Sequence, residues 1–157
     1  MDRAGFVRRY GAVYEHSPWV AEQCYDEARG LAPVELAPVF ARCVDRAPAA
    51  DKLALIRAHP DLAGRAAIAG ELTDASGSEQ SSAGIDRCTA AEFAEFRSLN
   101  ERYKARFGFP FVMAVRNRDR QEILAAFRAR IDNSPDEEFA TAIREIHEIA
   151  RLRLEAL

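Results

Sequence analysis

A histidine at a predicted helix end is the first residue whose position suits chemistry. The sequence His-Pro-Asp-Leu-Ala-Gly spans 59–64, and Pro60 forces the preceding helix to stop because proline cannot continue its hydrogen bonding. The negative end of the helix dipole would favour the imidazolium form of His59 and keep its pKa near neutrality, where proton transfer is efficient. A simple C-terminal cap explains the same position, and residue type and position alone favour the cap.

A polar segment, Leu-Thr-Asp-Ala-Ser-Gly-Ser-Glu-Gln at 72–80, supplies a second candidate group. Ser76, Glu79 and Gln80 stand at i, i+3 and i+4, so a helix would present a hydroxyl, a carboxylate and an amide on one face. Together these groups could hydrogen-bond a polar heterocycle rich in N–H and C=O groups. Ser76 and Glu79 also match a capping box, which requires no ligand. Taken alone, the capping box is the stronger interpretation, although both can hold together.

An aromatic segment that leads to an arginine is the third candidate. Phe-Gly-Phe-Pro-Phe at 107–111 gives a rigid apolar wall, and the stretch 109–115 is the one most suited to an extended backbone with free N–H and C=O groups. Arg116 at its end could clamp a carboxylate with two hydrogen bonds. The ordinary alternative is a core-filling loop with a surface arginine, since arginine occurs 20 times in the chain.

Helices are expected to position these three segments. Alanine occurs 30 times and strand-forming residues are scarce, which predicts an all-α multi-helix bundle with one domain over residues 1–157. Ser17 is expected to cap the second helix, with Pro18 at its first position, and residues 61–82 to form short helical turns joined by loops. Proline, glycine and capping residues delimit the other helices, at 2–10, 33–47, 49–58, 89–107, 119–131 and from about 134 onward.

Composition and charge exclude several classes of function. The net charge of −3 leaves no basic excess for nucleic-acid binding, and no apolar run approaches the roughly 20 residues of a membrane helix. Neither a phosphate-binding loop nor a metal-ligand spacing occurs, so an enzyme of this sequence is expected to use no cofactor and no metal. The chain has three widely spaced cysteines, Cys24, Cys43 and Cys88, a pattern typical of free thiols. Together with the absence of a signal peptide, this pattern predicts a cytoplasmic protein.

The three segments together resemble the family of decarboxylases that act on 2-oxo-4-hydroxy-4-carboxy-5-ureidoimidazoline (OHCU). The resemblance runs over essentially the whole chain, and it includes Ser-Pro-Trp at 17–19 and Leu-Arg-Leu at 152–154. It implies an all-α carboxy-lyase without cofactor or metal, usually a homodimer, that converts OHCU into (S)-allantoin during urate degradation. Functional coupling to uricase and hydroxyisourate hydrolase, the upstream enzymes, would follow from that role.

The resemblance also implies roles for the matching positions. His59 and Glu79 would form the essential catalytic pair. A second set would line the substrate pocket through side chains or backbone: Pro60, Ser76, Gln80, Phe111, Val112, Met113, Ala114 and Arg116. Arg118 and Arg120 are alternatives to Arg116. Eukaryotic members commonly end in a peroxisomal signal, whereas this sequence ends in Glu-Ala-Leu, which favours the cytoplasm.

The substrate's own chemistry explains why so few functional groups are needed. Its departing carboxylate lies beside a ring C=N bond that can accept the electron pair, so no Schiff-base lysine is required. We expect His59 to handle a proton near the substrate hydroxyl and carboxylate, while Glu79 and Gln80 hold the ureido and ring N–H groups so that one face is protonated. The competing class is a non-catalytic helical module that binds ureides or a partner protein. Loss of His59 or Glu79 would indicate it, and the sequence retains both.

Overall fold

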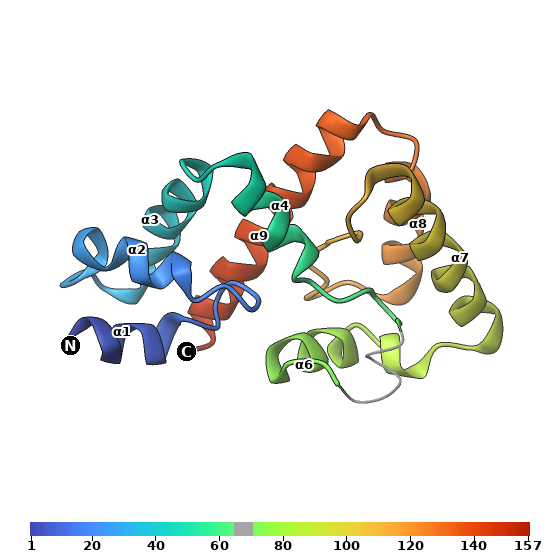
Figure 1. Cartoon of the computed structure of the whole chain (residues 1–157). Coiled ribbons are helices and arrows are strands. Elements are labelled where there is room, and N and C mark those ends of the chain that lie inside the picture. Colours follow the sequence, from blue (N-terminus) through green and yellow to red (C-terminus); the bar gives the residue numbers. More distant parts are fainter. Residues whose placement is uncertain (65–70) are drawn as a thin grey trace. The chain divides into compact units, whose positions relative to one another are not determined.

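The computed structural model describes residues 1–64 and 71–157. Its regular elements in these residues are all helices, which confirms the all-α prediction (Figure 1). The chain divides into two compact units, with residues 1–59 and 143–157 in unit 1 and residues 60–142 in unit 2. The expectation of one domain stays a prediction. No helix in the described residues is long and apolar enough to cross a membrane.

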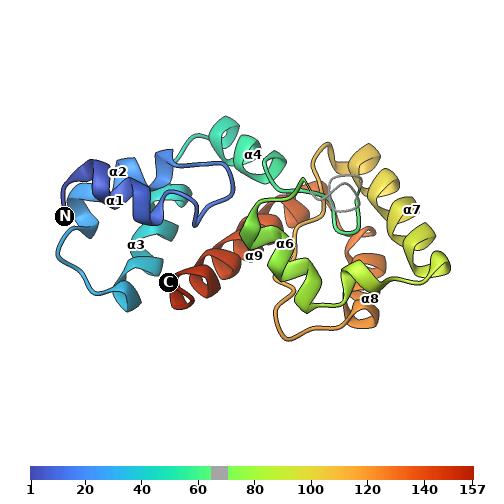
Figure 2. The ribbon, with the colours of Figure 1, turned by 90° about the horizontal axis from the view of Figure 1, so that it is seen from below.

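Unit 1 is built around aromatic packing. In both views α2 (Trp19–Ala28) lies beside α1 (Arg3–Tyr10) and α3 (Pro33–Asp45) (Figures 1 and 2). Phe40 lies at the centre, with the rings of Phe6, Tyr10 and Tyr14 at centroid distances of 6.0, 6.3 and 6.4 Å. The elements are α1 (Arg3–Tyr10), α2 (Trp19–Ala28), α3 (Pro33–Asp45), α4 (Ala49–Arg57) and the second part of α9 (Pro135–Glu155).

The predicted start of α2 is wrong in its detail. Pro18, not Ser17, is the N-cap residue, and no side-chain hydrogen bond caps this helix. The Ser17 hydroxyl is buried and donates to the carbonyl oxygen of Glu15 at 2.8 Å instead. The Ser17 side chain thus bonds the backbone that precedes the helix and caps none of the helix N–H groups.

Unit 2 follows the predicted capping signals closely. Thr89 and Glu92 form the expected capping box, and Asp119, expected as a cap, forms a capping box with Glu122. Gly108 ends its helix in the left-handed conformation at φ +76°. Residues 65–70, which belong to the predicted turns at 61–82, lie outside the described residues. The elements are α6 (Asp74–Ser82), the 3-10 helix η1 (Ile85–Arg87), α7 (Ala90–Phe107), α8 (Arg120–Arg130) and the first part of α9.

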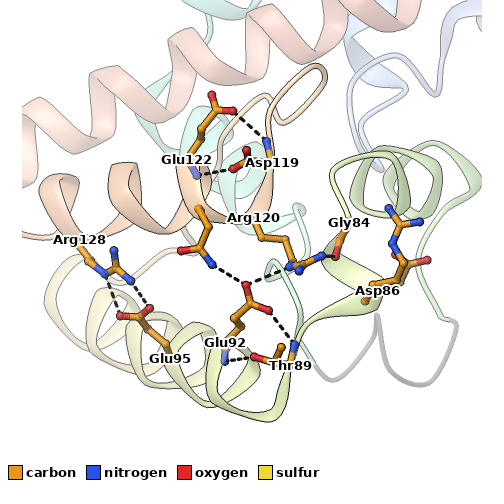
Figure 3. A network of polar contacts seen from close by, with 11 residues as sticks. Gly84, Asp86, Thr89, Glu92, Glu95, Asp119, Arg120, Glu122 and Arg128 are labelled. Carbon is orange, nitrogen blue, oxygen red and sulfur yellow. Dashed lines mark hydrogen bonds and ion pairs between the residues drawn. The ribbon is translucent and has the colours of Figure 1, made fainter.

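A polar network joins the ends of α6, α7 and α8 (Figure 3). Arg120 donates to Glu92 Oε2 and to the carbonyl oxygen of Gly84, both at 3.1 Å. Gln121 Nε2 donates to the same Glu92 oxygen at 2.7 Å. Gly84 has a φ of +78°, which glycine adopts without strain. The turn after α6 is therefore tied to the first turns of α7 and α8, which fixes the end of the helix that carries Ser76, Glu79 and Gln80.

Candidate active site

His59 is a buried histidine at the end of α4. Its Nδ1 lies 3.0 Å from the carbonyl oxygen of Leu55, four residues earlier, so the expected C-terminal cap is confirmed. A carbonyl oxygen can only accept, and Nδ1 must therefore carry the proton. In the neutral ring Nε2 then has the free electron pair. The cap thus fixes the tautomer and leaves Nε2 as a proton acceptor.

The prediction that the His59 pKa stays near neutrality is wrong. Burial lowers this pKa from the ordinary 6.5 to about 4, outweighing the hydrogen bond to the Leu55 carbonyl and the charge of Glu15, which raise it. Arg153 and His16 lower the pKa further. Taking an imidazolium out of water costs more free energy at this position than the favourable interactions with the helix end and one carboxylate contribute. At pH 7 the histidine is neutral, in the form that a general base requires.

A buried ion pair near His59 is the main feature of unit 1 that sequence reasoning missed. Arg153 Nη2 lies 2.9 Å from Glu15 Oε2, and the two side chains are only 9% and 1% exposed. Arg153 Nη1 also donates to the carbonyl oxygens of Ala12 and Val13 at 3.4 Å. A signal was present, because Arg153 continues the apolar stripe of Ile146 and Ala150 on the last helix, at steps of seven and three.

The loop after Pro60 is held by side chains of α6 and α7. Gln80 on α6 accepts from Ala63 N at 3.1 Å and donates to the Asp61 carbonyl oxygen at 3.3 Å. Asn100 on α7 donates to the Leu62 carbonyl oxygen at 2.9 Å, and Lys104 pairs with the Asp61 carboxylate at 2.6 Å. Gln80 is thus first of all a clamp on this loop, with one amide hydrogen remaining.

Close packing within the same loop explains Gly64. A Cβ atom at position 64 would come within 2.6 Å of the Asp61 Cβ, a distance that requires something to shift. Ala63, immediately before it, is buried in a left-handed conformation at φ +52°. The loop therefore has a specific backbone path, and close packing against Asp61 explains why position 64 is a glycine.

The local explanation of Ser76 is wrong. Thr73, not Ser76, caps α6, since its hydroxyl accepts from Ser76 N at 3.2 Å. Ser76 consequently lies inside the first turn, where it forms no capping box with Glu79. Ser76 and Gln80 are buried and Glu79 is partly exposed. The helical spacing assumed for these three residues is confirmed, and with it their common face.

A cavity of about 700 Å³ lies beside α6 within unit 2. Gln80 lines it, but Ser76 and Glu79 do not.

Among residues 1–64 and 71–157, no group of three or more His, Cys, Asp or Glu side chains is placed to hold a metal ion.

The segment 109–115 is non-helical, as predicted, and buried. Within the described residues of unit 2, the N–H groups of 111–115 have no protein acceptor. Its rings pack against α7 and α8: Tyr103 lies 5.5 Å from Phe111, which stacks on Phe127 at 3.9 Å. Arg116 is exposed. The segment is a row of buried backbone donors with an arginine at its end.

The predicted site residues belong to both compact units of the chain. His59 is the last residue of unit 1 and Pro60, which is partly exposed, the first of unit 2. Within unit 2, Gln80 is in direct contact with the loop that follows Pro60.

Known proteins resemble this chain over almost its full length. A sequence model described as OHCU decarboxylase matches residues 1–155. The 2-oxo-4-hydroxy-4-carboxy-5-ureidoimidazoline decarboxylase of Haloferax volcanii is 45% identical over 154 residues, 98% of this chain and 89% of that protein. A uric acid degradation bifunctional protein of Bacillus sp. (strain TB-90) is 36% identical over 157 residues, 100% of this chain but 30% of the relative.

Two crystal structures share the fold. That of (S)-allantoin synthase matches with a TM-score of 0.79 and 32% identity, over 99% of this chain and 50% of that one. That of OHCU decarboxylase in the presence of (S)-allantoin matches with a TM-score of 0.71 and 26% identity, over 87% of both chains. Fold and relatives together define an all-helical decarboxylase, that is, a carboxy-lyase. Within that class, the chain belongs to the OHCU decarboxylase family.

Proposed function

We propose that the protein removes CO₂ from OHCU and forms (S)-allantoin in urate degradation, without a cofactor. Membership in the family supports this activity. The structural observation that carries it is the state of His59. The ring is buried and neutral, its Nδ1 proton is committed to Leu55, and Nε2 is therefore a proton acceptor of fixed orientation.

In the proposed reaction the bond to the carboxylate breaks and CO₂ leaves. The electron pair passes into the adjacent ring C=N bond, and the ring nitrogen takes a proton from solvent. His59 Nε2 accepts the proton of the substrate hydroxyl, which becomes the carbonyl of the product. The carbon that bears the ureido group gains a second proton from solvent on one face, which sets the S configuration, and the proton on His59 returns to solvent. The net change is loss of CO₂ and gain of one proton.

The remaining site residues are proposed as binding groups. Glu79 would hold ureido and ring N–H groups, with Ser76 and the remaining amide hydrogen of Gln80 beside it on α6. The unpaired N–H groups of 111–114 suit the substrate's carbonyl oxygens. Pro60 would line the pocket and the exposed Arg116 would hold the carboxylate.

Three wider features remain part of the proposal. We propose a homodimer, which sedimentation would test, and a cytoplasmic location. We also propose functional coupling to uricase and hydroxyisourate hydrolase. The bifunctional Bacillus relative, named for uric acid degradation and longer than this chain, supports a link with other steps of that process.

The activity is tested by making the unstable substrate in situ with uricase and hydroxyisourate hydrolase and following its decay. We expect the protein to accelerate decay well above the spontaneous rate. Glu79→Gln should abolish the acceleration with an unchanged helical spectrum, whereas Glu101→Gln, on the exposed face of α7, should retain it. No acceleration by the folded protein would contradict the proposal, and full activity of Glu79→Gln would remove Glu79 from the site.

A further inference from the structure

Glu138, at the beginning of α9, is a fully buried carboxylate in unit 2 that the proposed reaction does not use. Its Oε1 accepts from Tyr103 Oη at 2.6 Å and from Arg130 Nε at 2.9 Å. Its Oε2 accepts from Asn133 Nδ2 at 3.0 Å. Burying a charged pair costs free energy that its own attraction often fails to return. Such a cluster therefore calls for a role besides stability.

Arg130 connects this carboxylate to the segment 109–115. Its Nη1 donates to the Val112 carbonyl oxygen at 2.8 Å, and its guanidinium carbon lies 4.2 Å from the centre of the Phe111 ring. Phe111 in turn stacks on Phe127 of α8. A guanidinium is planar and rigid, so the bond to Glu138 and the ring beneath it together fix the direction of the bond to Val112.

The anchored carbonyl determines where the next N–H points. The peptide bond between Val112 and Met113 is trans, since none in the described residues is cis, and in a trans peptide the C=O and N–H bonds point in opposite directions. Because the Val112 oxygen faces Arg130, the Met113 N–H faces away from it. Met113 is a buried residue, and within the described residues of unit 2 its N–H has no protein acceptor. An unpaired buried donor is costly unless a ligand satisfies it.

We propose that Arg130 and Glu138 are positioning residues of the active site: they orient the Val112–Met113 peptide so that the Met113 N–H donates to a carbonyl oxygen of the bound ureide. This inference rests on the proposed function and deepens it. Neither side chain touches the substrate. They act through one peptide plane, and the donor they present is a backbone group that no side-chain substitution removes.

The first experiment uses the unmodified protein. (S)-Allantoin is titrated into protein labelled with ¹⁵N at methionine alone. Met1, the other methionine, carries an α-amino group and no backbone amide, so the methionine amide resonance is that of Met113. A second, uniformly labelled sample reports saturation through other residues. We expect the Met113 amide proton to move downfield and its hydrogen exchange to slow on saturation. A Met113 resonance that stays unchanged while other residues report saturation would overturn the proposal.

The second experiment removes the anchor without leaving a buried charge unpaired. Arg130→Met combined with Glu138→Gln eliminates both charges, and the glutamine oxygen still accepts from Tyr103. We expect KM for OHCU to rise about tenfold with kcat within about twofold, since a contact made equally in the ground and transition states affects binding alone. The downfield shift of the Met113 amide with allantoin should be lost.

A matched control lies on the same helix. Arg128 of α8 pairs with Glu95 of α7 through two hydrogen bonds (Figure 3), and both side chains are exposed. Arg128→Met with Glu95→Gln should leave KM and the Met113 shift unchanged. Should the Arg130 double variant fail to fold, Arg130→Lys keeps the charge for Glu138 but not the rigid fork, and a smaller rise in KM is expected.

Retention of wild-type KM and of the Met113 shift in the Arg130 variants would refute the positioning role. That result differs from a failure of the proposed function. If the protein does not accelerate OHCU decay at all, the activity itself is wrong, whereas an active protein with an unresponsive Met113 amide contradicts this inference alone.

Discussion

Burial of His59 should make the stability of the protein depend on pH in a defined window. The folded protein holds the His59 pKa at about 4, against the ordinary 6.5 expected in the unfolded chain. Above pH 6.5 the ring is neutral in both states and the full stability is present. As the pH falls below 6.5, His59 becomes protonated in the unfolded chain but not in the folded protein. The free energy of unfolding therefore falls until the pH reaches about 4.

The magnitude follows from the two pKa values. A difference of about 2.5 between 6.5 and about 4 corresponds to about 3 kcal/mol, since one pKa unit is 1.36 kcal/mol. About 2 kcal/mol of this is lost between pH 7 and pH 5, where the unfolded chain is already protonated and the folded protein is not. His59→Asn removes the effect, because asparagine does not titrate and its amide can still donate to the Leu55 carbonyl.

Urea unfolding followed by circular dichroism at pH 7, 6 and 5 measures this loss in both proteins. The two proteins differ at position 59 alone, so the difference between their pH dependences isolates His59. We expect the wild type to lose about 2 kcal/mol more than His59→Asn. Equal losses, within about 0.5 kcal/mol, would refute the conclusion that His59 is buried in its neutral form.

Three further predictions follow from the site. Because His59 must be neutral to accept a proton, kcat/KM should fall on the acid side well below pH 6.5, toward about 4; a midpoint at 6.5 would contradict a desolvated base. Gly64→Ala should lower stability by about 1–3 kcal/mol in urea unfolding, since its Cβ meets that of Asp61 at 2.6 Å. Gly77→Ala in α6, with its nearest contact at 3.9 Å, should instead be neutral or stabilising. Arg116→Gln should raise KM for OHCU with kcat nearly unchanged, and an unaltered KM would exclude Arg116 as the carboxylate contact.

Local sequence signals predicted the fold well because they act over a few residues. Thr89, Asp119 and Gly108 end or begin helices as expected, since caps and left-handed glycines depend on the neighbouring backbone alone. The same reasoning failed at Ser17 and Ser76. Each serine could serve two local patterns, and the surrounding structure selected between them.

The electrostatics of the site could not be predicted in this way. The helix-end position of His59 favours a raised pKa, and only its burial, a property of the folded chain, reverses the sign. Arg153 and Arg130 look like surface residues among twenty arginines, yet both pair with buried carboxylates. Both arginines lie on apolar stripes of their helices, which indicates burial. Their partners could not be predicted in this way, because Glu15 lies 138 residues from Arg153 and Glu138 lies in the first turn of the next helix after Arg130.

The central claim is that this site directs a proton to one face of the decarboxylated intermediate. The most direct test is the circular dichroism of the allantoin that forms when uricase and hydroxyisourate hydrolase supply OHCU in the presence of the protein. We predict rapid formation of the S enantiomer with the wild type, and slow racemic product with a folded His59→Asn variant. Racemic allantoin at the spontaneous rate in the presence of the folded wild-type protein would contradict the account.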